Sequence, residues 1–350
     1  MQAFKFKYNR VRRAYTGGFG IDTIRQAATQ ADGMYPEDWI ASAVNAYPRP
    51  GEPPEAGLSI IDDEQETRFV NLLTGDSEAL LGEEHLKHFG PETGFLMKLL
   101  DSNIRLPVQV HPDNRKALEL FNSPYGKTEA WLILATRSIA DEEPYLLIGF
   151  NEKLDKDVFV RESINGELIS GLDMMHKVQV KPGDIYMISG GLPHAIGPGL
   201  TVIEIMEPSD WIAVSERLCG SIVIDDARRF NQLEPEKAMT MFDFSPLTRQ
   251  ELMQKSHIEP IKIDSSLQML IDRSRIKYFG LEKLTLNGSY RLVNRDNCCR
   301  AGIVVEGHAT VNGSLSLRPG DTFFLPACMP EQHFTGTAAI VMALPPACPE

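Results

Sequence analysis

Two histidines and a carboxylate stand in short segments that could together bind one metal ion. His111 follows Gln109 by two residues in the run VQVH, so both side chains project from one face if this run is a strand. Glu129 opens the next β-like run, and His194 comes just after a Pro-Gly-Asp hairpin. Two imidazoles, one carboxylate and an amide oxygen suit Zn²⁺, with other divalent transition metals also admissible.

One carboxylate against a divalent cation leaves a net positive centre, which can hold an anionic oxygen such as that of an enediolate. Taken singly, Gln109, His111 and Glu129 could each be a polar residue satisfied at the rim of a barrel. All four residues occur in the order expected for converging strands of a small barrel. This joint occurrence favours a metal site.

Short β-rich runs must position these residues. From Leu106 such runs alternate with turn residues at even spacing, which is typical of an antiparallel barrel or sandwich. Before about residue 100, Gly and Pro punctuation predicts long loops on a sheet. Residues 225–257 are helix-like, with Pro near the predicted helix starts, and β-like runs return after about Ile258.

An internal repeat indicates two related domains. VQVKPGDIYMISGGLPHAI and LSLRPGDTFFLPACMPEQHF share a strand, a Pro-Gly-Asp turn, a second strand and a proline ten residues after the turn glycine. We therefore predict a mainly β protein of two cupin (jelly-roll) barrels with a helical insert or linker. The expected division is 1–224 with the metal site, 225–257 helical, and 258–350 without a metal site.

The second copy of the repeat lacks the metal-binding residues. Glu331 stands where the first copy has His194, and no HxH or QxH precedes the hairpin. His333 is alone, and a solitary histidine is more often structural. We expect this domain to act as scaffold or cover for the first.

Composition narrows the class of partner. The 350 residues carry a formal net charge of −13 with a pI near 5.2, which opposes nonspecific binding to nucleic acid or anionic lipid. The five cysteines form no CxxC pair. No run is apolar enough for a secretory signal or a membrane span, so we expect a cytoplasmic protein with a small-molecule partner.

The segments QVHPDN, GKTEAW and PHAIGPG resemble the metal-binding signatures of type I mannose-6-phosphate isomerases, or phosphomannose isomerases, of the cupin superfamily. PEDWIAS and EPEKAMTMFDF also resemble family segments. The resemblance is strong over residues 107–207, and it implies one zinc ion per chain bound by Gln109, His111, Glu129 and His194. It also implies interconversion of mannose 6-phosphate and fructose 6-phosphate by proton transfer between C1 and C2.

Two further residues are candidates for catalysis. Lys127 precedes Glu129 by two residues and would share its face if the strand began that early, which would place an ammonium beside the metal. It could otherwise be a solvated turn lysine. Glu204, ten residues after His194, matches an acidic position of the family, although it could also be a buried structural carboxylate.

One departure from the family pattern concerns an arginine. The family has it about twenty residues after the metal histidine, in segments resembling EPTDLSVR, whereas this chain has EPSDWIAVSER with Val214 at that position. Either Arg217 takes the catalytic place, or the chain lacks this guanidinium. A three-residue shift reverses the facing on a strand, so Arg217 would need a bulge or loop.

Other functions stay open on the sequence alone. A noncatalytic sugar-binding or regulatory cupin fits Val214. An isomerase of a related or unphosphorylated sugar fits the same departure. Two histidines and a carboxylate can also hold Fe²⁺ in a cupin oxygenase.

Overall fold

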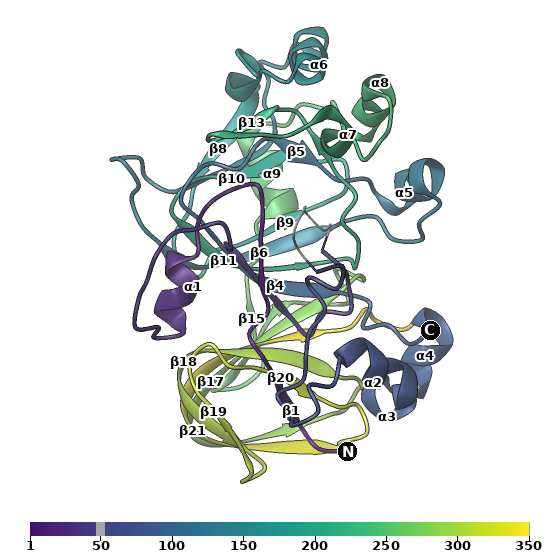
Figure 1. Cartoon of the computed structure of the whole chain (residues 1–350), viewed down its shortest axis with the longest axis vertical. Helices are drawn as coiled ribbons and strands as arrows, with labels where there is room; N and C mark the ends of the chain where they lie inside the picture. Colours follow the sequence, from purple (N-terminus) through teal and green to yellow (C-terminus); the bar gives the residue numbers. More distant parts are fainter. Residues whose placement is uncertain (47–52, 350) are drawn as a thin grey trace.

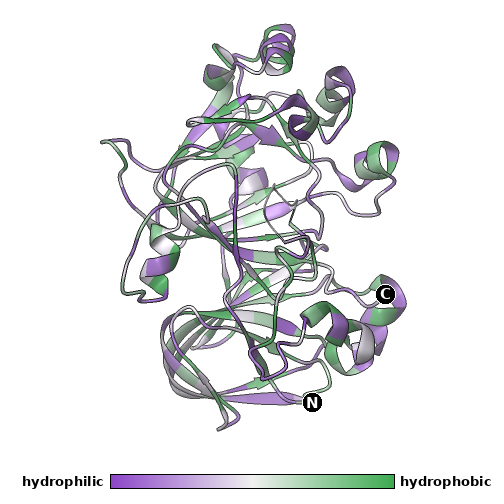
Figure 2. Cartoon of the chain, in the orientation of Figure 1, coloured by the Kyte–Doolittle hydropathy of each residue, from purple (hydrophilic) through white to green (hydrophobic). Residues whose placement is uncertain are grey.

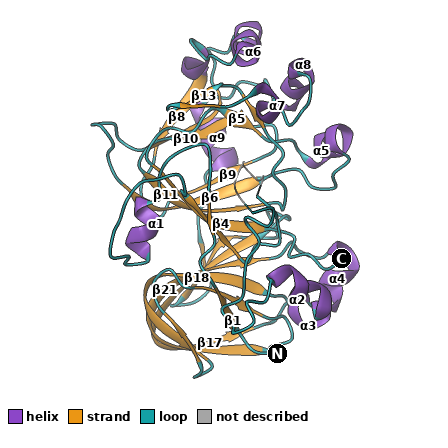
Figure 3. Ribbon diagram, in the orientation of Figure 1, coloured by secondary structure: helices purple, strands orange, loops and turns teal. Residues whose placement is uncertain are grey.

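Antiparallel β-sheets form the framework of the computed structural model, which describes residues 1–46 and 53–349 (Figures 1 and 3). Part of the predicted loop-rich region, 47–52, and the last residue lie outside this description. A six-stranded sheet runs in the order β2 (Arg10–Val11), β3 (Glu37–Ile40), β4 (Leu96–Ser102), β11 (Leu200–Met206), β6 (Glu129–Thr136), β9 (Ile185–Ile188). A five-stranded sheet runs in the order β12 (Ala213–Val214), β5 (Gln109–Val110), β10 (His194–Ile196), β7 (Tyr145–Phe150), β8 (Met175–Gln179).

The C-terminal half forms an eight-stranded sheet. Its order is β1 (Phe4–Phe6), β20 (Thr322–Leu325), β18 (Arg300–Val311), β21 (Glu331–Leu344), β17 (Gly280–Val293), β16 (Leu267–Ile271), β15 (Ile261–Lys262), with β19 (Leu315–Leu317) paired to β18. A separate hairpin joins β13 (Leu218–Cys219) and β14 (Ile222–Val223). The mainly β prediction is confirmed, although none of the described sheets closes into a continuous barrel.

The six-stranded sheet lies between the five-stranded sheet and the C-terminal sheet, and its side chains alternate between the two cores. Along β6, Trp131 and Ile133 pack in the core shared with the five-stranded sheet, whereas Ala130 and Leu132 pack in the core shared with the C-terminal sheet. Figure 2 shows hydrophobic and hydrophilic residues following one another along the strands. Since alternate residues share a face, Glu129 projects to the same side as Trp131, toward the five-stranded sheet.

The repeated Pro-Gly-Asp turn has the same structure in both halves. The Asp184 carboxylate accepts a hydrogen bond from the Lys181 backbone N–H at 3.0 Å, and Asp321 accepts one from Arg318 at 3.1 Å. The turn glycine has a positive φ in both copies. Each turn leads into a strand and then, after a short loop, into a second strand, so the repeat is a repeat of structure.

Helices lie around the sheets (Figure 1). They are α1 (Phe19–Ile24), α2 (Phe69–Gly75), α3 (Ser77–Leu81), α4 (Glu83–Phe89), α5 (Asn114–Phe121), α6 (Lys156–Asn165), η1 (Gly171–Met174), α7 (Asp226–Arg229), α8 (Pro235–Ala238), η2 (Met239–Met241) and α9 (Arg249–Ser256). The last four occupy the predicted helical segment. No helix in the described ranges is both long and apolar enough to cross a bilayer.

The proposed division at residues 224 and 257 remains a prediction. The structure adds that β1 pairs with β20, so the first residues of the chain contribute to the C-terminal sheet. Helices α2 to α4 also lie beside that sheet (Figure 1). The N-terminal segment therefore contacts both halves.

Candidate functional site

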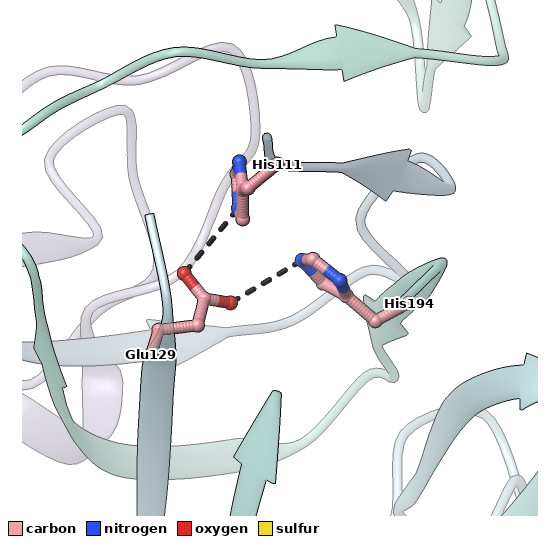
Figure 4. A group of neighbouring side chains, drawn as sticks. All are labelled: His111, Glu129 and His194. Carbon is pink, nitrogen blue, oxygen red and sulfur yellow. Dashed lines mark ion pairs between the residues drawn. The ribbon is translucent and has the colours of Figure 1, made fainter. Parts of the chain in front are cut away.

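Two histidines and one glutamate meet between the facing sheets of the N-terminal half (Figure 4). His194 opens β10 and pairs with Gln109 of β5, while Glu129 opens β6 on the opposite sheet. The Glu129 carboxylate lies 3.3 Å from His111 Nε2 and 3.2 Å from His194 Nε2. All three side chains are almost fully buried.

Backbone carbonyls fix which nitrogen of each imidazole carries the proton. His111 Nδ1 donates to the Trp211 carbonyl at 2.8 Å, and His194 Nδ1 donates to the Leu192 carbonyl at 2.8 Å. Burial and the nearby Lys127 ammonium lower the pKa of His111 to about 4, so this ring is neutral near pH 7. The Nε2 atom of His111 thus presents a lone pair to Glu129.

The cluster fits a divalent cation. His111 Nε2 and Glu129 Oε2 are buried without a hydrogen-bond partner among the described residues, as expected when two acceptors face each other. A cation between them satisfies both, and imidazole fixed through its second nitrogen is the usual form of a zinc ligand. The Gln109 amide nitrogen lies 3.3 Å from His194 Nε2. Rotating the amide by a half-turn would point its oxygen, the atom that can bind a cation, toward the cluster.

A cavity of about 590 Å³ opens beside this cluster. Gln109, Glu129 and Trp131 line it from the metal side. Its other charged lining residues include Arg13, Glu37, Lys98, Lys127, Glu204 and Asp210. The volume is that of a small-molecule site.

Lys127 and Glu204, the two candidates for catalysis, both line this cavity. The strand begins only at Glu129, yet Lys127 Nζ lies 3.8 Å from Glu129 Oε2 and 3.4 Å from Asp210 Oδ1. Burial raises the pKa of Glu204 to about 8, although Lys98 Nζ, 3.2 Å from its carboxylate, opposes that shift. Glu204 therefore carries a proton at neutral pH when no metal is bound.

The structure does not bring Arg217 into this group. Its guanidinium pairs with Asp226 at 3.0 Å, its side chain is 43% exposed, and it is not among the residues that line the cavity. Val214 lines the cavity instead, as part of β12. The three-residue shift is not absorbed by a bulge, so the position of Arg217 gives no support to the catalytic role predicted for it.

Sequence reasoning missed five charged residues of the cavity, namely Arg13, Glu37, Lys98, Asp210 and Arg228. Lys98 Nζ lies 3.5 Å from Glu37 Oε2, and Arg13 Nε lies 3.2 Å from Glu37 Oε1. Lys98 could have been identified from the sequence. In the apolar run LMKLLDS, strand alternation places it on the same face as Leu96 and Leu100, and a charged residue on a buried face needs a partner. Arg13 follows β2 in a loop, where no periodicity could have singled it out.

Comparison with known proteins finds similar sequences among mannose-6-phosphate isomerases. Residues 274–345 match the family model described as the cupin domain of mannose-6-phosphate isomerase. A mannose-6-phosphate isomerase of Streptococcus mutans is 28% identical over 269 residues, covering 74% of this chain and 77% of that protein. The mannose-6-phosphate isomerase ManA of Bacillus subtilis is 24% identical over 269 residues, covering 75% and 80%.

Solved structures give the same fold. The crystal structure of the mannose 6-phosphate isomerase from Bacillus subtilis superposes with a TM-score of 0.74 at 21% identity and covers 98% of this chain and 99% of that one. A zinc-bound mannose 6-phosphate isomerase gives a TM-score of 0.73 at 16% identity and covers 99% and 100%. The predicted cupin fold is confirmed.

Fold and site together define a cupin protein with a candidate metal centre in its N-terminal half. More particularly, the chain is similar in sequence to mannose-6-phosphate isomerases and shares their fold, which agrees with the resemblance of its motifs.

Proposed function

We propose that this chain is a metal-dependent aldose-ketose isomerase that interconverts mannose 6-phosphate and fructose 6-phosphate through an enediol or enediolate. The observation that carries the proposal is the buried His-Glu-His cluster at the wall of a cavity that also holds Lys127 and Glu204. The donor set and the zinc-bound structural neighbour favour Zn²⁺. A divalent ion bound there supplies Lewis acidity, which stabilises negative charge on the sugar oxygens.

The chain's own residues supply the remaining chemistry. His111, Glu129 and His194, with Gln109, would hold the ion. The Lys127 ammonium, fixed between Glu129 and Asp210, can polarise a substrate oxygen or relay a proton. Glu204 is buried and titrates near neutral pH, which suits a group that moves a proton between neighbouring carbons.

The test is an isomerase assay on chelator-treated protein. We expect no conversion of mannose 6-phosphate without metal and full recovery on adding Zn²⁺. Unphosphorylated mannose and glucose 6-phosphate serve as substrate controls. Metal-loaded protein that converts no aldose-ketose phosphate pair would rule the proposal out.

Val214 at the cavity wall favours a second candidate, a sugar-binding cupin without turnover. This function predicts saturable binding of mannose 6-phosphate with no ketose formed. Calorimetric titration beside the assay separates the two candidates, since turnover excludes the binding role as the main one.

A further inference from the structure

We propose that Arg13 binds the anionic group at the end of the substrate remote from the metal, a phosphate monoester, and so supplies the guanidinium that is absent at position 214. This inference rests on the proposed function for its substrate. Its physical content, an anion site at Arg13, can be measured without turnover.

A chain of ion pairs orders the cavity from the metal cluster outward. Lys127 lies 3.8 Å from Glu129 and 3.4 Å from Asp210, and Arg13 Nη1 lies 3.8 Å from the other side of Asp210. Arg13 is therefore separated from the metal ligands by a lysine and a carboxylate. A six-carbon sugar phosphate has its reacting carbons at one end and its phosphate at the other, which matches this order.

The guanidinium of Arg13 has donors to spare. It makes ion pairs with Glu37 and Asp210, but within the described residues no hydrogen bond uses it. Its side chain is 21% exposed and lines the cavity, whereas Lys98 and Lys127 are almost fully buried between carboxylates. A planar guanidinium with free N–H groups is the side chain best suited to bidentate binding of a phosphate.

Charge also favours an anion here. Burial alone would lower the pKa of Arg13, but Glu37 and Asp210 outweigh burial and raise it, so Arg13 stays charged. With Glu204 protonated, the charges of Arg13, Lys98 and Lys127 balance those of Glu37, Glu129 and Asp210, so a bound divalent ion would make the group of charges positive. The partly buried position of Arg13 weakens screening by water and so strengthens the attraction that results.

The loop that carries Arg13 is held in place. The Arg13 backbone N–H donates to the Met34 carbonyl at 3.0 Å, and the Tyr15 hydroxyl donates to Glu37 at 2.6 Å. Neighbouring Val11 belongs to β2, which pairs with β3. The guanidinium is thus positioned before any ligand arrives, which lowers the entropic cost of binding.

The experiment compares Arg13→Gln and Arg13→Lys with Arg12→Gln, a neighbouring arginine that does not line the cavity, and with Arg217→Gln. Steady-state kinetics are measured with mannose 6-phosphate and with unphosphorylated mannose. Calorimetry measures the binding of inorganic phosphate alone. Metal content and the urea midpoint confirm that each variant is folded and loaded.

We expect Arg13→Gln to weaken phosphate binding and to raise KM for mannose 6-phosphate by about 30- to 100-fold, the loss of one bidentate charge-assisted contact. Arg13→Lys should have a phosphate affinity and a KM between those of the wild type and Arg13→Gln, because lysine keeps the charge but lacks the paired N–H groups of the guanidinium. Constants for unphosphorylated mannose, and all constants of Arg12→Gln, should change less than about threefold.

Two results would overturn the inference: phosphate binding unchanged in folded Arg13→Gln, or an equal fall in kcat for both sugars, which would place Arg13 at the reacting carbons. Phosphate affinity lost in Arg217→Gln instead would assign the site to Arg217. If the protein turns over no sugar, phosphate calorimetry still decides, so failure of the proposed function and failure of this inference are distinct. If Arg13→Gln does not fold, Arg13→Lys is read by the same criteria.

Discussion

The two halves of the molecule share one turn and one strand register, yet among the described residues only the first half brings together side chains that could bind a metal ion. Glu129 pairs with Ile188, and Arg300 pairs with Leu325; both partners stand five residues after their turn glycine. Arg300 therefore occupies in the second half the position that Glu129 occupies in the first. The buried guanidinium of Arg300 thus stands where the first half has the buried carboxylate of Glu129, a candidate metal ligand.

The neighbouring positions changed with it. Glu204 pairs across the strands with Lys98 in the first half, and Met342 pairs with Glu282 in the second. Arg300 Nε lies 3.0 Å from Glu282, and both side chains are nearly fully buried. A buried carboxylate needs a compensating positive charge. In the first half a metal ion could supply this charge to Glu129, whereas in the second half Arg300 supplies it to Glu282.

The largest expected difference concerns His194 and Glu331, which open equivalent strands. His194→Ala removes a metal ligand and should lower kcat/KM for mannose 6-phosphate by about 10³-fold or more, with loss of bound zinc. Glu331→Ala breaks only exposed pairs with Arg291 and His333, so activity and zinc content should stay within about twofold. Zinc content by mass spectrometry and the isomerase assay check both; zinc retained in His194→Ala would contradict the assigned site.

Arg300 tests the second half in the same way. Arg300→Met leaves Glu282 buried without its partner and should lower the free energy of unfolding by about 3 to 5 kcal/mol, measured by urea denaturation. The double variant with Glu282→Leu removes both charges and should recover most of this loss. Zinc binding should not change in either variant. A double variant as unstable as the single one would show that the pair is not the cause.

Strand alternation and the Pro-Gly-Asp repeat were enough to predict the β architecture, and motif order with the family resemblance predicted the four candidate metal ligands, of which His111, Glu129 and His194 lie together. Lys127 was a candidate because it precedes Glu129 by two residues, and Glu204 because it matches an acidic position of the family that the motifs resemble. Arg13 could not be predicted, because a loop after β2 brings it to Asp210 nearly two hundred residues later in the chain. The place of Arg217 depended on the strand register, which the sequence could not settle. In the structure Val214 pairs with Gln109 at the cavity, and Arg217 forms an ion pair with Asp226 away from the cavity.

The two halves should also differ in their response to acid. Glu37 pairs across the strands with Leu100, and the equivalent position in the second half is Leu267, paired with Leu284. Burial alone would raise the pKa of Glu37, but Arg13, Lys98 and two hydrogen bonds outweigh burial and lower it to about 2. The stability that Glu37 contributes is therefore present above about pH 4.5 and is lost as the pH falls toward 2.

A shift from 4.5 to about 2 corresponds to about 3 kcal/mol. Glu37→Gln should lower the free energy of unfolding by about that amount at pH 7 and by much less at pH 3. Urea denaturation of metal-free protein at several pH values measures this, and removal of the metal keeps its own pH dependence out of the curve. An equal loss at both pH values would show that ionisation of Glu37 does not stabilise the fold.

The smallest expected difference lies in the turns themselves. Gly183 has φ of +96° with open space where a Cβ would stand, so Gly183→Ala should cost only the strain of the left-handed backbone, about 1 to 2 kcal/mol. Gly320 has φ of +81°, and a Cβ there would meet the Arg25 side chain and lie 3.1 Å from Arg25 Cα, so Gly320→Ala should cost more. Urea denaturation of the two variants measures the gap. Equal losses would mean that Arg25 moves freely, and that the contact between the N-terminal segment and the C-terminal turn contributes little to holding the halves together.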